Sequence, residues 1–88
     1  MKFTVVWIPS AEHELAELWM GAPDRQEVRD AADRIDAALA ETPMALGESR
    51  SGNVRILFAY PLGVEFEVLA RDRRVRVLSV WRFDSRSG

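Results

Sequence analysis

Cysteine is absent from this chain of 88 residues, and histidine, lysine and tyrosine each occur only once. The lack of cysteine excludes a disulfide framework and a cysteine-based metal site, so a reducing cytoplasm is the expected location. No apolar run approaches the roughly 18 residues of a membrane-spanning helix, and the stretch over residues 3–8 is too short for a signal-peptide core. The sequence therefore predicts a soluble cytoplasmic protein that has no membrane segment and needs no cofactor.

The length leaves room for one domain built around a single hydrophobic core. Apolar residues make up 48% of the chain and charged residues 30%, which is the balance of a globular protein and not of a disordered one. We predict one domain over residues 1–84, followed by a frayed tail over residues 85–88.

The net charge of −2 conceals an asymmetry between the two halves of the chain. Residues 1–49 carry four basic and ten acidic side chains, whereas residues 50–88 carry eight arginines and four carboxylates. The basic half is the natural place for an anionic partner to bind, although ordinary solvation of two different surfaces explains the asymmetry equally well.

Two segments in the first half have the apolar spacing of amphipathic helices. The first covers residues 11–20, and Ser10 is its expected N-cap. The second extends to about residue 41, and its start at Asp24 and Glu27 has the spacing of a capping box. Proline and glycine between the two segments predict a short connection, so the helices should form a hairpin.

Four segments are rich in β-branched and aromatic residues and are predicted to be strands, namely residues 2–8, 53–60, 64–70 and 74–83. Turns are expected at residues 61–63 and 71–73, and residues 44–52 are expected to form a loop. The order β-α-α-β-β-β predicts an α+β fold, in which a two-helix hairpin packs on one face of a four-stranded antiparallel sheet.

Alternation along the strands predicts two faces of the sheet. The face beneath the helices should contain Phe3, Val5, Trp7, Val54, Ile56, Phe58, Tyr60, Val64, Phe66, Val68, Val75, Val77 and Trp81. The opposite face mixes apolar residues with arginines, which is typical of a protein-binding patch. A partner should contact it at Leu57, Leu69, Arg74, Arg76, Leu78, Val80 and Arg82. The C-terminal tail or the mate of a homodimer is the alternative occupant.

Two stretches of the sequence resemble the RelE/ParE family of bacterial toxins. The segment VVWIPSAEHELAELW, residues 5–19, is similar to the family's opening strand, its Ser/Thr-Pro step and its first helix. Residues 53–82 resemble the family's three terminal strands, which end in a step matched by Leu78, Val80 and Arg82. The resemblance covers almost the whole chain.

The resemblance implies the toxin of a type II toxin–antitoxin system, of the kind that stabilises plasmids and inhibits growth. One branch of the family cleaves mRNA in the ribosome, another poisons DNA gyrase, and a small cognate antitoxin silences both. An acidic, amphipathic antitoxin segment would suit the predicted partner surface, with its carboxylates on the arginines. Sequence-specific binding of free nucleic acid is not expected, because Glu65 and Glu67 share this face and repel phosphates.

This sequence has few residues that could carry out metal-independent RNA cleavage. Such cleavage needs a base, cations around the phosphate and an acid for the leaving oxygen. The candidates are Arg50, Arg55, Arg82 and Tyr60, with Glu65 or Glu67 as the base. The single histidine, His13, lies off the apolar stripe of its helix and is interpreted as a solvated side chain. RNA-cleaving members carry an arginine at the start of the third strand, where this sequence has Gly63.

These differences from the RNA-cleaving members of the family favour a toxin that acts by binding a protein, with DNA gyrase as the preferred target. They disfavour an enzyme. Two alternatives remain open at this point. One is a ribosome-dependent mRNA endonuclease, and the other is a degenerate, non-toxic member that only binds its antitoxin.

Overall fold

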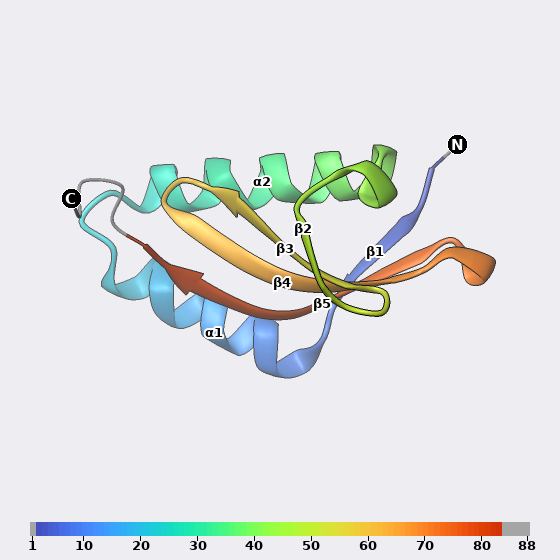
Figure 1. The fold of residues 1–88 in the computed structure, drawn as a ribbon. Coiled ribbons are helices and arrows are strands. Elements are labelled where there is room, and N and C mark those ends of the chain that lie inside the picture. Colours follow the sequence, from blue (N-terminus) through green and yellow to red (C-terminus); the bar gives the residue numbers. More distant parts are fainter. Residues whose placement is uncertain (1, 84–88) are drawn as a thin grey trace.

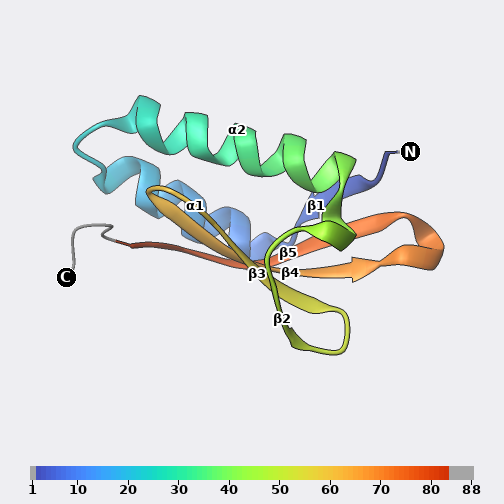
Figure 2. The same ribbon diagram turned by 45° about the horizontal axis from the view of Figure 1, so that its top comes forward.

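The chain folds into two layers, a pair of helices and a sheet, in a computed structural model that describes residues 2–83 without the side chains of residues 50 and 51. The helices are α1 (Pro9–Gly21) and α2 (Arg25–Glu41), with short 3-10 turns at Pro43–Ala45 and Ala70–Asp72. The strands are β1 (Thr4–Trp7), β2 (Glu48–Ser51), β3 (Val54–Ala59), β4 (Leu62–Leu69) and β5 (Arg74–Arg82). Both helices lie on the same side of the sheet (Figures 1 and 2), so the predicted α+β fold with a helical hairpin on one face is confirmed.

The sheet differs from the predicted one in strand number and direction. It has five strands in the order β1-β5-β4-β3-β2, and β1 is parallel to β5 while the other pairs are antiparallel. The additional strand β2 lies in the segment that was expected to be a loop. Because β2 adds one reversal of the chain before β3, β3 has the same direction as β1, and the sheet is mixed where an antiparallel one was predicted.

The first backbone N–H groups of the two helices are accounted for in different ways. The Asp24 side chain accepts a hydrogen bond from the backbone N–H of Glu27 at 3.2 Å, as the predicted cap of α2 requires. Helix α1 begins earlier than predicted, because Pro9 occupies its first position and Ile8 is the N-cap, so Ser10 lies inside the first turn. Proline suits this position because its missing N–H would have no partner in the helix anyway.

The hydrophobic core lies between the helices and the middle of the sheet. Helix α2 contributes Val28, Ala31, Ile35 and Leu39, and β4 contributes Leu62, Val64, Phe66 and Val68. The core is completed by Ala11 of α1 and by Val75, Val77 and Val80 of β5. The helical stripes and the core side of β4 are therefore as the apolar spacing predicts.

Strand β3 has the opposite orientation to the predicted one. Leu57 pairs with Val64 and packs against the core, whereas Phe58 pairs with Gly63 and is 53% exposed. The prediction that Phe58 lies beneath the helices and Leu57 outside was wrong. It failed because the outward side of β3, which includes Val54 and Ile56, is as apolar as its inward side.

A β-bulge reverses the predicted faces in the second half of β5. Phe66 pairs with Val77 but Glu65 pairs with Ser79, so Leu78 is an extra residue in β5. Beyond the bulge Val80 is buried and Trp81 faces outward, the reverse of the prediction, because an extra residue shifts the alternation by one. The backbone N–H of Val80 donates to Glu14 Oε1 of α1 at 3.1 Å, which ties the strand beyond the bulge to the helical layer.

Candidate binding surface on the open face of the sheet

The face of the sheet turned away from the helices, here called the outer face, is uncovered by any other element of residues 2–83 (Figure 2). Strand register places its residues in rows across the strands. One end carries arginines, the middle carries carboxylates and the other end carries aromatic rings.

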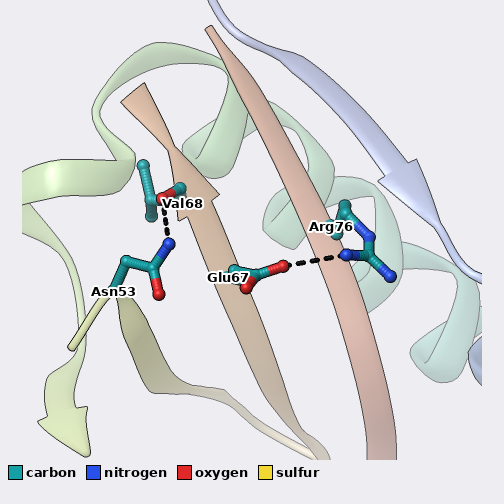
Figure 3. Close-up of polar contacts among 4 residues, drawn as sticks. All are labelled: Asn53, Glu67, Val68 and Arg76. Carbon is teal, nitrogen blue, oxygen red and sulfur yellow. Dashed lines mark hydrogen bonds and ion pairs between the residues drawn. The ribbon is translucent and has the colours of Figure 1, made fainter. Parts of the chain in front are cut away.

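The arginine end lies beside the β4–β5 hairpin. Arg76 donates to Glu67 Oε1 at 3.0 Å across β5 and β4 (Figure 3). Arg74 pairs in register with Leu69, and Val6 of β1, 41% exposed, pairs with Arg76. In the same view, the Asn53 side-chain amide donates to the Val68 carbonyl at 3.0 Å and holds the start of β3 against β4. Three predicted antitoxin contacts, Leu69, Arg74 and Arg76, are therefore neighbours.

The other predicted antitoxin contacts do not join this group. Val80 and Leu57 face the core, so neither side chain is presented on the outer face. Arg82 lies on the helix side, where its guanidinium is 4.0 Å from the Glu27 carboxylate of α2. Leu78 is half-buried at the bulge. The bulge in β5 and the orientation of β3 separate residues that simple alternation had placed together.

Four aromatic side chains gather at the opposite end of the outer face, and we call Phe58, Tyr60, Trp81 and Phe83 the aromatic cluster. Their rings meet edge to face, with centroid distances of 6.1 Å for Phe58–Trp81, 5.2 Å for Phe58–Phe83 and 5.6 Å for Tyr60–Phe83. Tyr60 is 42% exposed, so its predicted place in the core was wrong. The cluster escaped prediction because it depends on the bulge and on the orientation of β3.

Gly63 makes room for the largest ring of the aromatic cluster. It lies between Phe58 and Trp81 in the row across β3, β4 and β5. A Cβ atom on Gly63 would lie 2.7 Å from the Trp81 indole, closer than van der Waals contact allows. The position where the resemblance expects an arginine therefore holds no side chain, and an indole occupies the space above it.

Carboxylates surround the aromatic cluster. Glu65 follows Gly63 by two residues on β4 and so shares the outer face, and Glu48 of β2 pairs with Ile56. Beside Tyr60, an open pocket of about 450 Å³ is lined by Asp24, Gln26, Glu27, Asp30 and Arg34. Arg34 donates to the Tyr60 carbonyl at 3.0 Å.

The four nuclease candidates are not brought to one place by the described residues. Arg55 lies on the helix side, part-buried, and donates to the Leu46 carbonyl at 3.3 Å. Arg82 is also on the helix side, but it is displaced by about four residues, or roughly 13 Å, along the strand direction and lies two strands away. Tyr60 lines the pocket beside α2 and meets the ring of Phe83. The Arg50 side chain is outside the described part of the structure.

The remaining ionisable candidates also lack a catalytic setting. His13 is exposed and lies 3.3 Å from Glu17, one helical turn away, as expected for a solvated histidine. The Glu67 carboxylate forms an ion pair with Arg76. Within residues 2–83 no three histidine, cysteine or carboxylate side chains cluster to hold a metal ion, and no helix in this range is long and apolar enough to cross a membrane.

The helical layer has a groove that the sequence did not predict. It has a volume of about 520 Å³, lies between α1 and α2, and is lined by Trp7, Glu12, Leu15, Ala16, Trp19, Val28, Arg29, Ala32, Asp33 and Asp36. The Trp7 indole N–H donates to Asp36 Oδ1 at 2.8 Å at this groove. The Arg25 guanidinium stacks 4.6 Å from the centre of the Trp19 ring. Trp19 itself is partly buried against the core.

Solved structures of toxins match this fold over nearly its whole length. The toxin–antitoxin complex RelBE2 from Mycobacterium tuberculosis contains a chain that matches with a TM-score of 0.79 at 13% identity, covering 94% of this chain and 100% of that one. A chromosomal ParDE system from P. aeruginosa gives a TM-score of 0.73 at 16% identity, covering 94% and 98%. An archaeal RelE–RelB complex from Pyrococcus horikoshii gives 0.64 at 15%, covering 93% and 96%.

Comparison by sequence gave no match to any family model and none to any curated protein. The structural matches include both RelE and ParE toxins. The chain therefore has the fold of the RelE/ParE toxins of type II toxin–antitoxin systems, as the sequence resemblance predicts. The fold does not separate an mRNA-cleaving toxin from one directed at gyrase.

Proposed function

We propose that this protein is the toxin of a type II toxin–antitoxin system, that it acts by binding a protein target, and that a small antitoxin neutralises it. The observation that carries the proposal is the full-length similarity to toxin chains that were solved together with their antitoxins. DNA gyrase is the preferred target, as in one of the two branches that the sequence resemblance implies.

The residues of the outer face favour binding of a protein target over cleavage of RNA. A phosphate undergoing cleavage requires several cations around it. In the described structure Arg55 and Arg82 lie on the helix side, and Arg76 is paired with Glu67. The place above Gly63 is filled by the Trp81 ring. Aromatic rings and carboxylates suit contacts to a protein better than contacts to RNA.

Expression from a tightly controlled promoter tests this proposal. Growth should stop on induction and resume when the small open reading frame beside the gene is co-expressed. Purified protein should inhibit supercoiling of DNA by gyrase, and mRNA on programmed ribosomes should remain uncut. Codon-specific cuts that disappear in Arg55→Ala and Arg82→Ala would establish the endonuclease instead. Unaffected growth would leave the non-toxic, antitoxin-binding alternative.

The antitoxin is expected to bind at the arginine end of the outer face. Arg76→Glu should weaken the complex by about 1–2 kcal/mol, because it removes the ion pair with Glu67 and leaves two carboxylates facing an acidic antitoxin segment. Titration calorimetry of the toxin with its antitoxin measures this change. Asp33→Arg, at the rim of the groove between the helices, is the matched control and should leave the affinity unchanged. If Asp33→Arg breaks the complex and Arg76→Glu does not, the antitoxin binds in the groove instead.

A further inference from the structure

The outer face has opposite chemistry at its two ends, and the predicted antitoxin surface uses only the arginine end. The aromatic cluster at the other end is only partly covered, since Phe58 is 53% exposed and Tyr60 42%, while Trp81 and Phe83 are half-buried. Exposed apolar patches bordered by polar residues mark interaction sites on soluble proteins.

The charges near the aromatic cluster favour a cation. Glu65 and Glu48 lie on the outer face, and Asp24, Glu27 and Asp30 line the pocket beside Tyr60. Two arginines are described nearby, Arg34, which donates to the Tyr60 carbonyl, and Arg82, which lies 4.0 Å from Glu27, so the carboxylates named above outnumber the guanidinium groups. The faces of aromatic rings attract cations, and a neighbouring carboxylate adds a direct charge attraction.

We propose that the aromatic cluster and Glu65 form a docking site for an arginine side chain, flanked by apolar residues, on the toxin's protein target. Arginine suits the site better than lysine, because its planar guanidinium stacks on rings and also pairs with a carboxylate. This inference rests on the proposed function, since it names the chemistry of the target segment that a protein-binding toxin recognises.

A second copy of the chain fits less well. A second copy packed face to face about a two-fold axis would oppose Glu65 to itself, because Glu65 lies near the centre of the outer face. Like charges in such a position disfavour association.

A nucleic acid fits less well for a similar reason. Exposed rings can stack on bases, but single-strand binding sites combine them with a positively charged groove for the phosphates. Here the described side chains around the rings are mainly carboxylates. RNA binding is therefore an outcome that the experiment must be able to detect.

Selection of peptides tests the inference. A displayed library of random dodecapeptides is panned against the full-length protein, with counter-selection on Phe58→Asp, a change at an exposed position. We expect enrichment of arginine between apolar residues. For a selected peptide, replacement of that arginine by citrulline should weaken binding about tenfold, and Glu65→Gln in the protein about threefold. Glu12→Gln, which removes a carboxylate at the groove between the helices, is the control and should change nothing.

Three outcomes would overturn the inference. The first is a library that yields no peptide dependent on Phe58, or peptides without basic residues. The second is equal affinity for the arginine and citrulline peptides. The third is a single-stranded RNA dodecamer that binds more tightly than any selected peptide and is released by Phe58→Asp. Growth inhibition and antitoxin binding are measured separately, so the proposed function can stand when this inference fails.

Discussion

Replacement of Phe66 by alanine should lower the free energy of unfolding by about 3–5 kcal/mol, which is a large part of the stability of a domain this small. Phe66 is fully buried at the centre of β4, where it pairs with Val77 of β5 and Arg55 of β3. The truncation removes the transfer free energy of the ring and leaves a cavity that packed neighbours can fill only in part. Urea denaturation followed by circular dichroism measures the loss.

Phe58→Ala provides the matched control on the neighbouring strand. Its ring is 53% exposed and meets the rings of Trp81 and Phe83 edge to face, so the truncation leaves no closed cavity. Edge-to-face pairs contribute about 0.5–1.5 kcal/mol each, so the loss of two such pairs is expected to lower the free energy of unfolding by about 1–3 kcal/mol. If Phe58→Ala destabilised the protein as much as Phe66→Ala, the assignment of inner and outer faces on β3 would be incorrect.

Gly47→Ala should be the most damaging single-methyl change, with an expected loss of roughly 2–4 kcal/mol. Gly47 has φ of +70°, which disfavours any residue with a Cβ atom, and an added Cβ would lie 2.3 Å from the Ile56 carbonyl oxygen. That oxygen belongs to the backbone of β3 and cannot move without disturbing the β2–β3 pairing. Urea denaturation gives the magnitude, and amide hydrogen exchange should show faster exchange along β2 and β3.

Gly52→Ala separates the two causes of this loss. Gly52 also has a positive φ, +56°, but an added Cβ would meet no atom within 4 Å. The control therefore suffers the same kind of backbone strain without the clash, and its expected loss is about 1 kcal/mol. Equal losses for the two variants would show that the contact with the Ile56 carbonyl is unimportant.

Local patterns in the sequence were sufficient for the helices and for the inward side of β4. The stripe of Val28, Ala31, Ile35 and Leu39 is buried as predicted, because helical spacing alone determines which side of α2 is apolar. Strand β2 could not be found in this way. Its sequence, ESRS, has no apolar alternation, and it is held at the edge of the sheet by backbone pairing with β3.

The candidate site was only partly predictable for two physical reasons. Alternation fails at a bulge, and Leu78 is the extra residue that turned Val80 inward and Trp81 outward. Alternation is also uninformative where both sides of a strand are apolar, as in β3. The arginine end of the outer face lies before the bulge, so Arg74 and Arg76 were placed correctly, whereas the aromatic cluster lies beyond it.

The parallel pairing of β1 with β5 has a consequence for how the chain acquires its structure. Thr4 through Trp7 pair with Arg74 through Val77, so β1 has its partner about 70 residues later in the chain. The hydrogen-bonding groups of β1 therefore remain unpaired until β5 has formed beside it. Contacts between such distant residues slow folding, because a long loop must be ordered before they can form. The pairing of β1 and β5 is therefore expected to be among the last events in the folding of this domain.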